Sequence, residues 1–181
     1  KWATFNVGAS KPEDYGDYFA WGETEPKDKY IWATYKWCQG TANTLTKYCS
    51  NSQYGNADYK TILDPEDDAA IVHWGSDWRM PTRDEVDELC EMCSWEWTSV
   101  NGVAGYKVTG PNGNSIFLPA AGLRAGTGVS NRGSVGYYWS STAYSSNDAY
   151  YLYLDSSNVY PGTRYYSKYY GRTVRCVAPG V

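Results

Sequence analysis

The sequence has few of the side chains from which most catalytic and metal sites are built. Its 181 residues include one histidine, His73, together with two methionines and three phenylalanines. The cysteine pair of "CEMC", Cys90 and Cys93, has neither a second CxxC nor histidine ligands to complete a zinc site. A redox CxxC usually opens a helix, whereas this pair closes a predicted one. We therefore expect no cofactor, and we expect both thiols to pack as small apolar groups.

Long apolar runs and a strong net charge are missing as well. No stretch approaches the roughly 20 apolar residues of a membrane-spanning helix, so we expect no membrane span in this chain. The net charge of −4 argues against a surface that neutralises phosphates, and we expect no nucleic-acid partner. The chain starts at Lys1, without an initiator methionine or a signal-peptide pattern. We expect Lys1 to follow an upstream export signal or lipid anchor.

Tyrosine, tryptophan and glycine are abundant instead. The chain has 19 tyrosines, 9 tryptophans and 18 glycines, a composition typical of short strands and frequent turns. A length of 181 residues fits one domain with a substantial core. We expect residues 1–181 to form a single α+β domain with two helices, short antiparallel strands and long irregular loops.

Two segments carry helix signals. Residues 65–74 follow Asp64, a good N-cap residue, and have acidic side chains in the first turn. Residues 82–93 begin with the capping box of Thr82 and Glu85, which precedes an apolar stripe with helical spacing. The sequence predicts one helix in each of these two segments.

The strand signals are short runs of apolar and aromatic residues between turns. The predicted strands are residues 106–109, 115–118, 136–142, 149–155 and 171–177. The turn "GPNGN" joins the first two as a hairpin. Residues 156–170 are polar and rich in turn residues, and we expect an irregular surface loop there.

Cys38 and Cys49 flank a polar segment, "CQGTANTLTKYC", that has little material for a core. A disulfide between them would close this loop and contribute about 3 kcal/mol of stability. The alternative is two free thiols, as in a cytosolic protein. We favour the disulfide, and we expect Cys176 to be buried in the core.

Residues 149–171 contain eight tyrosines in 23 positions, interspersed with serine, asparagine, aspartate and glycine. In a strand, Tyr151, Tyr153 and Asp155 would lie on the side opposite Leu152 and Leu154. Exposed tyrosines beside small polar residues are typical of binding loops, because tyrosine supplies contact area at low entropic cost.

The alternative is that the tyrosines cover a small β-rich core, and we prefer it for Tyr137, Tyr138 and Tyr150. For the remainder we predict recognition. The predicted ligand-binding face, solvent-exposed and continuous, consists of Tyr144, Asp148, Tyr151, Tyr153, Asp155, Tyr160, Arg164, Tyr165, Tyr166, Tyr169 and Tyr170.

Six stretches in order along the chain resemble one known family. They are "KWATFNVGAS", "YGDYFAWGE", "WGSDWRMPTRDEVDEL", "GYKVTGPNGNSIFLPAAG", "GYYWSST" and "GRTVRCV". Together they resemble the Fibrobacter succinogenes major paralogous domain, which is common in secreted proteins of Bacteroides-like bacteria. Family members usually have cysteine where Phe5 stands, so a disulfide at that position is absent, and Cys93 is left without an obvious partner.

The resemblance implies a C-type-lectin-like fold, similar to the variable proteins of diversity-generating retroelements. In those proteins, mutagenesis of adenines in AAC codons yields tyrosine, serine, aspartate and glycine but never lysine. From Tyr144 to Tyr170 only Lys168 falls outside the accessible set. A diversified segment and an undiversified tyrosine-rich paralogue both fit. The resemblance also implies a secreted or surface-anchored protein, bacterial or phage-borne, that acts as an adhesin toward a protein or glycan on another cell or surface.

Three other functions have weaker support. The implied fold includes formylglycine-generating oxidases, but Cys176 has no neighbouring cysteine, and His73 suits a helix C-terminus, so we expect no enzyme activity. A calcium-dependent lectin would need Asn147, Asp148 and Asp155 to converge on one ion, and the "EPN" and "WND" signatures are missing. Metal-free stacking of sugars on tyrosine and a structural pilus module are the remaining alternatives.

Overall fold

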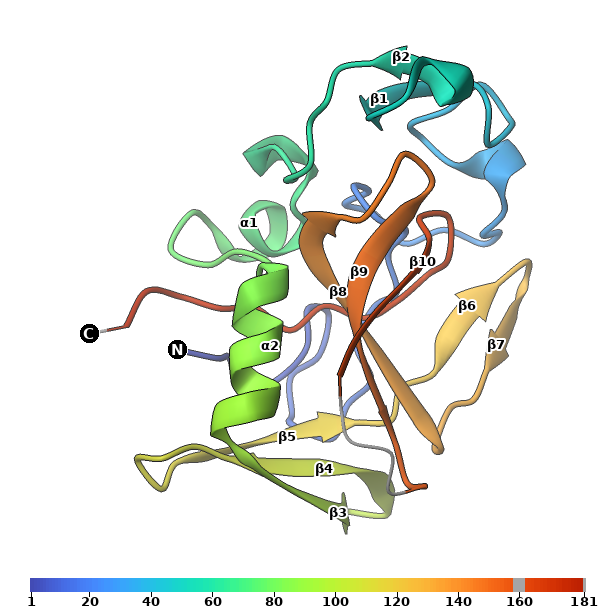
Figure 1. The fold of residues 1–181 in the computed structure, drawn as a ribbon. Coiled ribbons are helices and arrows are strands. Elements are labelled where there is room, and N and C mark those ends of the chain that lie inside the picture. The colour runs from blue at the N-terminus through green and yellow to red at the C-terminus, as the bar shows by residue number, and fades with distance from the viewer. Residues whose placement is uncertain (158–161, 181) are drawn as a thin grey trace.

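The computed structural model describes residues 1–157 and 162–180, which form an α+β fold (Figure 1). The helices are α1 (Ala69–Trp74), α2 (Arg83–Met92) and the single-turn 3-10 helices η1 (Trp32–Thr34), η2 (Ser52–Tyr54) and η3 (Pro65–Asp67). The strands are β1 (Leu45–Cys49), β2 (Gly55–Ala57), β3 (Ser94–Val100), β4 (Val103–Thr109), β5 (Ser115–Pro119), β6 (Leu123–Ala125), β7 (Gly128–Ser130), β8 (Val135–Ala143), β9 (Asp148–Asp155) and β10 (Gly162–Ser167).

The molecule has two antiparallel sheets of three strands each, with orders β10-β9-β8 and β3-β4-β5, and the second lies at one end of the molecule (Figure 1). Helix α2 lies along one face of the first sheet and ends at the second (Figure 1). Val86 and Leu89 of α2 pack in one buried cluster with Leu152 and Leu154 of β9 and Leu118 of β5. This cluster joins the helix to both sheets. Among the described residues, no helix has the length and apolar character of a membrane span.

The predicted second helix is confirmed, and the first is corrected. In α2 the Thr82 hydroxyl accepts a hydrogen bond from the Glu85 amide, and the Glu85 carboxylate accepts one from the Thr82 amide. The first segment instead forms the turn η3 and then α1, with a break at Asp68. Asp68 is the N-cap of α1, because its buried carboxylate accepts hydrogen bonds from the amides of Ala70 and Ile71, whereas Asp64 precedes η3 and makes no such bond.

The strand predictions hold except near the C-terminus. Strands β4, β5, β8 and β9 confirm the predicted hairpin and the two tyrosine-containing strands. Residues 171–177 are not a continuous strand but an extended segment with separate bridges to Phe19, Arg124, Tyr138 and others. The predicted loop 156–170 contains β10, which pairs with β9 over its whole length.

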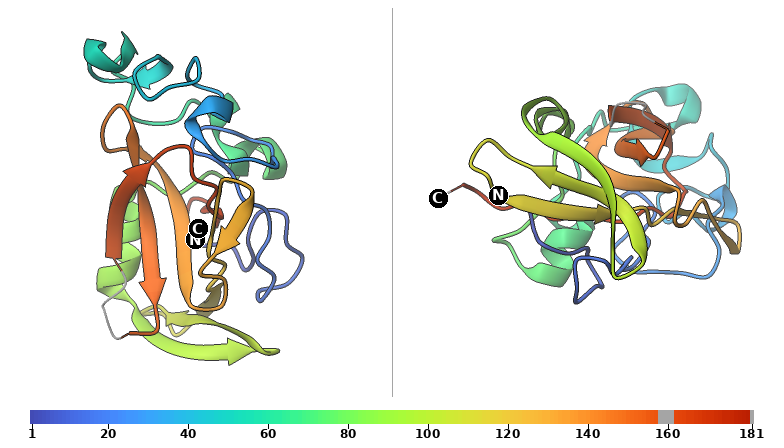
Figure 2. Two further views of the ribbon diagram at one scale, coloured as in Figure 1. Left: turned by 90° about the vertical axis from the view of Figure 1, so that its right-hand side faces the viewer. Right: turned by 90° about the horizontal axis from the view of Figure 1, so that it is seen from below.

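The C-terminal segment runs through the core and meets the N-terminal residues. Trp2 and Val177 form a bridge, and the two ends of the chain lie side by side (Figures 1 and 2). Arg175, fully buried, donates hydrogen bonds to Asn6 Oδ1 (2.7 Å) and to the carbonyls of Ala3 (3.1 Å) and Phe117 (2.8 Å). Burial lowers the pKa of this guanidinium to about 10.

Arg172 is buried against aromatic rings rather than against a carboxylate. Its guanidinium lies 3.8 Å from the ring centre of Tyr151 and within 5.3 Å of those of Tyr137, Trp139 and Tyr170. Two of its nitrogens, Nε and Nη1, have no hydrogen-bond partner among the described residues. Burial lowers its pKa to about 10, and the ring faces supply the compensating attraction.

The predicted disulfide between Cys38 and Cys49 is wrong, and all five cysteines are free. Backbone pairing closes the loop instead, because the Gln39 amide bonds the Thr44 carbonyl and Cys38 bridges Leu45. The Cys49 thiol points into the core and contacts Ser146 Oγ (3.7 Å). Cys90 and Cys93 pack against the α2 cluster, and Cys176 is fully buried, as the sequence predicts.

We expect the unfolding temperature to be the same with and without a reducing agent, because no disulfide restricts the unfolded chain. Thermal unfolding followed by circular dichroism tests this, with peptide mapping under non-reducing conditions as the control. A linked Cys38–Cys49 peptide, together with a lower unfolding temperature after reduction, would contradict the structure.

Candidate functional site

Strand β10 divides the predicted ligand-binding residues between two faces of its sheet. It is the edge strand of the β10-β9-β8 sheet, and the register pairs Arg164 with Tyr151 and Tyr166 with Ala149. Because side chains alternate along a strand, Tyr165 points to the face opposite that of Arg164 and Tyr166. The prediction of one continuous face is therefore wrong, and the residues form two clusters around β10.

The first group, here called the Tyr165 cluster, consists of Tyr144, Tyr150, Tyr165 and Arg83. Tyr144 and Tyr165 stack in parallel with ring centres 3.6 Å apart, and both are 47% exposed. Tyr150 meets both rings edge-on, and the Arg83 guanidinium lies 4.6 Å from the Tyr150 ring centre. The neighbouring Tyr165 phenol raises the pKa of Tyr144. This cluster lies on the face where α2 packs.

The second group, here called the Tyr166 cluster, consists of Tyr153, Arg164, Tyr166, Tyr169 and Tyr170. Arg164 is exposed, and its guanidinium lies 3.6 Å from the ring centre of Tyr153. Tyr169 and Tyr170 stack at 4.4 Å, and Tyr166, 53% exposed, packs against Tyr170 at 5.4 Å. Burial, followed by hydrogen bonding to Tyr169, raises the pKa of Tyr170 to about 12.

Tyr151 does not belong to an exposed surface. It is buried among Tyr137, Trp139 and Arg172, in the core cluster beneath the Tyr166 cluster. The alternation of β9 was predicted correctly, but both faces of this central strand are covered at that position. Burial raises the pKa of Tyr151, which Arg172 partly offsets. Tyr160 lies outside the described residues.

Asp155 is engaged by its neighbours and is not free for a ligand. It accepts hydrogen bonds from the hydroxyl of Tyr153 (2.6 Å) and from both the amide and the hydroxyl of Ser157. Burial opposes ionisation of Asp155, but the hydrogen bonds from Ser157 and Tyr153 outweigh it and lower the pKa. Burial, with the bond to Asp155, raises the pKa of Tyr153 to about 12. Asp155 therefore fixes the Tyr153 ring on which Arg164 lies.

The residues considered for calcium do not converge. Asp148 and Asp155 are the first and last residues of β9, so their backbones are about 23 Å apart at the usual rise of a strand. Burial raises the pKa of Asp148, which Lys168 partly offsets, and Asn147 precedes it at the same end. This spacing rules out one ion bound by Asp148 and Asp155 together.

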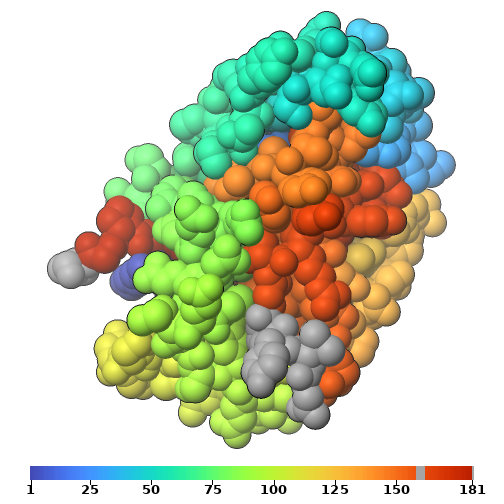
Figure 3. All heavy atoms as spheres, in the orientation of Figure 1, coloured from blue at the N-terminus to red at the C-terminus, as the bar shows by residue number. Residues whose placement is uncertain are grey.

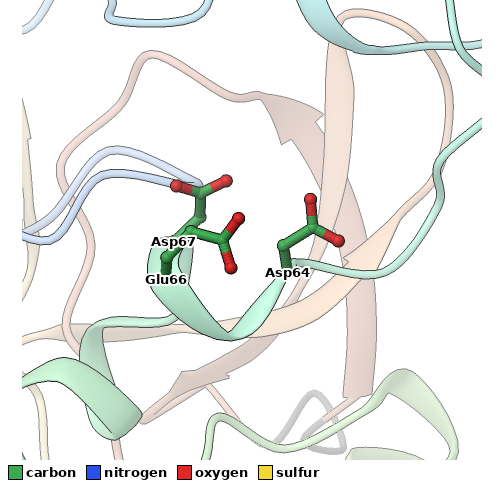
Figure 4. Close-up of side chains that lie close together, drawn as sticks. All are labelled: Asp64, Glu66 and Asp67. Atoms are coloured by element: carbon green, nitrogen blue, oxygen red, sulfur yellow. The ribbon is translucent and has the colours of Figure 1, made fainter.

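Another acidic group, Asp64, Glu66 and Asp67, brings three carboxylates together at the turn η3 (Figure 4). The Lys47 ammonium lies among them, 2.8 Å from Asp64 and 2.7 Å from Asp67. The Tyr48 hydroxyl donates a further hydrogen bond to Asp67. Lys47 and Lys60, the latter 2.7 Å from Asp64, thus offset most of the negative charge of this group, and Lys47 holds η3 against β1.

Two of the cysteine thiols, those of Cys90 and Cys176, are in settings that suppress reactivity. Burial raises the pKa of Cys90 and of Cys176 to about 12, so both thiols are protonated at neutral pH. A His73 ring nitrogen is 2.6 Å from the Thr24 carbonyl.

A hollow of about 690 Å³ lies between the end of α2, the β4–β5 turn and both termini, and it is lined by Trp2, Leu89 and others. No residue of either tyrosine cluster lines it.

Sequence reasoning missed three contributors, Tyr150, Arg83 and Trp32. Tyr150 shares a face with Leu152, which predicts a core position, yet it is only half-buried and lies at the N-terminal end of α2, against Arg83. Arg83 is the first residue of α2 and reaches Tyr150 only through the tertiary fold. Trp32, from η1, contacts Tyr169 at 5.1 Å, a contact without any sequence signal.

Lys168 fixes the end of β10 from inside the core. It is 1% exposed, and its ammonium donates hydrogen bonds to the carbonyls of Tyr48 (2.9 Å) and Ser146 (2.7 Å). It also lies 4.8 Å from the Trp21 ring centre. Burial lowers its pKa to about 7, against the opposing influence of Cys49, Asp148 and Asp58. One buried cation therefore joins β1, the β8–β9 turn and the end of β10.

We expect the free energy of unfolding to rise by about 1 kcal/mol between pH 7 and pH 8 because of Lys168. Its folded pKa, about 7, lies below the unfolded value of 10.5, so the unfolded chain binds more protons in this range and stability increases with pH. Chemical denaturation at both pH values measures the slope. Lys168→Met should remove this contribution, whereas Lys107→Met, at an exposed position, should keep it. If the free energy of unfolding rose by the same amount between pH 7 and pH 8 in Lys168→Met and in the wild type, Lys168 would not be the group responsible.

One comparison with known proteins matches the part of the chain that contains β10. Figure 3 shows β10 at the surface beside α2. No curated protein and no solved structure significantly matches this chain. The family model described as a domain of unknown function, DUF8237, matches residues 85–177, which include both sheets from β3 to β10. The match spans just over half of the chain, and the protein therefore belongs to the DUF8237 family.

Proposed function

We propose that this protein is a recognition domain that binds a protein or glycan ligand on another cell or surface through the two tyrosine clusters beside β10. The exposure of tyrosine at this edge carries the proposal. Tyr144, Tyr165 and Tyr166 are 47–53% exposed, although each has a large apolar ring. Exposed apolar groups that gather in one place mark interaction sites more often than scattered ones do.

The geometry of the rings suits binding. Tyr144 and Tyr165 support each other by stacking, and Tyr169 and Tyr170 do the same, so little rotamer freedom remains to be lost on contact. Each ring offers contact area, and each hydroxyl finds partners in water or at an interface. Arg164 adds a guanidinium held on Tyr153. Tyrosine and arginine are the residue types that dominate measured binding energies.

The fold and location belong to the same proposal. We infer a C-type-lectin-like fold, supported by the resemblance of the six motifs and by the adjacent ends of the chain, where Trp2 pairs with Val177. The resemblance also supports a secreted or surface-anchored adhesin without catalytic activity. It is compatible with retroelement diversification of the tyrosine-rich segment, for which the neighbouring DNA is the test.

We expect Tyr165→Ala and Tyr166→Ala each to weaken ligand binding by on the order of 1–3 kcal/mol, because each removes a ring from the contact area. The free energy of unfolding should change by only about 0.5 kcal/mol, because both side chains are exposed. The measurement uses the labelled domain on a glycan array and on an array of extracellular proteins, followed by titration of any ligand found.

The matched control is Tyr59→Ala, because Tyr59 is 70% exposed but lies outside both clusters. Tyr151→Ala is the opposite control, since a buried ring should cost about 3–5 kcal/mol of stability. If Tyr165→Ala and Tyr166→Ala bind as well as Tyr59→Ala does, the clusters are not the binding site and the proposal fails.

A further inference from the structure

The backbone of β10 has an unpaired edge. The Lys168 amide donates to the Asn147 carbonyl at 2.9 Å, which sets the alternation of the antiparallel ladder. By this alternation Gly162, Arg164 and Tyr166 form backbone hydrogen bonds with β9. The amides and carbonyls of the residues between them point to the outer side of β10, away from β9. The outward residues are Thr163, Tyr165 and Ser167. Among described residues, only the Ser167 carbonyl has a backbone partner, the Tyr170 amide at 3.4 Å.

This edge has few of the features by which proteins usually protect an exposed strand: one charge, Arg164, and one contact with α2, where the Thr163 hydroxyl donates a hydrogen bond to Asp87. Gly162–Ser167 contains no proline, no lysine and no bulge, and its pairing with β9 has no register shift. The opposite edge of the same sheet, on β8, is covered by Gly122 and by Thr173 of the C-terminal segment. The left view of Figure 2 shows β10 as the outer strand.

The edge strand of the other sheet is a useful comparison. Strand β3 carries an acidic residue, Glu96, and its rings Trp95 and Trp97 turn onto Tyr106 of the neighbouring strand. None of its side chains is a large exposed apolar group. In β10, by contrast, Tyr165 and Tyr166 are about half exposed on either side of the free edge. The edge strand β10 therefore offers exposed apolar rings to a partner, whereas β3 does not.

We propose that β10 binds an extended peptide segment of a partner protein by strand addition, with the segment continuing the β10-β9-β8 sheet. This inference deepens the proposed recognition function and rests on it. The outward amides and carbonyls of Thr163 and Tyr165 and the amide of Ser167 are complementary to another extended backbone. The alternate side chains of the added strand would contact the Tyr165 cluster on one face and the Tyr166 cluster on the other.

The charges at this edge define the chemistry of the segment. Arg164 has no carboxylate within ion-pair distance among the described residues, and it is exposed on the face of the Tyr166 cluster. On the other face, Arg83 is already paired with Asp87 at 3.4 Å. We therefore infer a segment with apolar or aromatic side chains for the tyrosines and an acidic residue opposite Arg164.

A displayed library of linear random peptides is the probe, selected on the whole domain. For a selected peptide, amide hydrogen exchange by nuclear magnetic resonance should show new protection at Thr163, Tyr165 and Ser167. Ser167→Pro removes one outward amide and leaves the bonds to β9 intact, so affinity should fall about tenfold, whereas Ser167→Ala should stay within about twofold. Methylating alternate backbone nitrogens of the peptide tests the same bonds without altering the protein.

Each alternative outcome overturns the proposal. Amide protection at residues outside β10 would show that the peptide does not bind at this edge. The same conclusion would follow if Ser167→Pro and Ser167→Ala bound the peptide equally well and methylation of the peptide nitrogens did not weaken binding. A concentration-dependent dimer that Ser167→Pro disrupts would make a second copy the occupant. If Tyr165→Ala abolishes glycan binding and no peptide is selected, the recognition function stands and strand addition falls.

Discussion

The fold depends on three basic side chains in the last part of the chain that are buried without a carboxylate partner among the described residues. Lys168, Arg172 and Arg175 are each about 1% exposed or less, and the interior meets their charge with carbonyls, an amide and ring faces. Desolvating a charge is costly, so these contacts must be well formed before the segment can remain inside. The extended C-terminal segment, residues 171–177, is consequently held in place between the N-terminal residues and the β10-β9-β8 sheet.

The contacts of these buried side chains explain how the edge strand β10 can be exposed and still be held in a fixed position. Arg172 packs on Tyr151 and Tyr170, and Lys168 holds the turn before β9, so the rings at the surface rest on a fixed layer. The tyrosines of the two clusters support one another within that layer. Their exposure is therefore a property of the folded state and not a sign of loose packing.

Local signals were sufficient for much of the fold. The capping box of Thr82 and Glu85, the hairpin turn and the alternation of β9 depend on neighbours within a few residues, and the structure has all three. The failures have two causes. Strand β10 forms a hairpin with β9, with Gly162 opposite Tyr153, which the polar, turn-rich composition of residues 156–170 concealed. Cys49 stays free because its thiol turns toward Ser146, distant in sequence. The division of the tyrosines between two faces could not be predicted either, because the sequence predicts a loop for residues 156–170, and side chains alternate between two faces only in a strand.

The burial of Lys168 also limits how this segment can vary. A library that randomises residues 144–170 as one block would lose most of its members to unfolding, because it would replace Lys168 and Tyr151 along with the surface. A library restricted to Tyr144, Arg164, Tyr165 and Tyr166 changes exposed side chains only. We expect the same distinction in natural relatives, with sequence change concentrated at Tyr144, Arg164, Tyr165 and Tyr166 rather than at the buried residues beneath them.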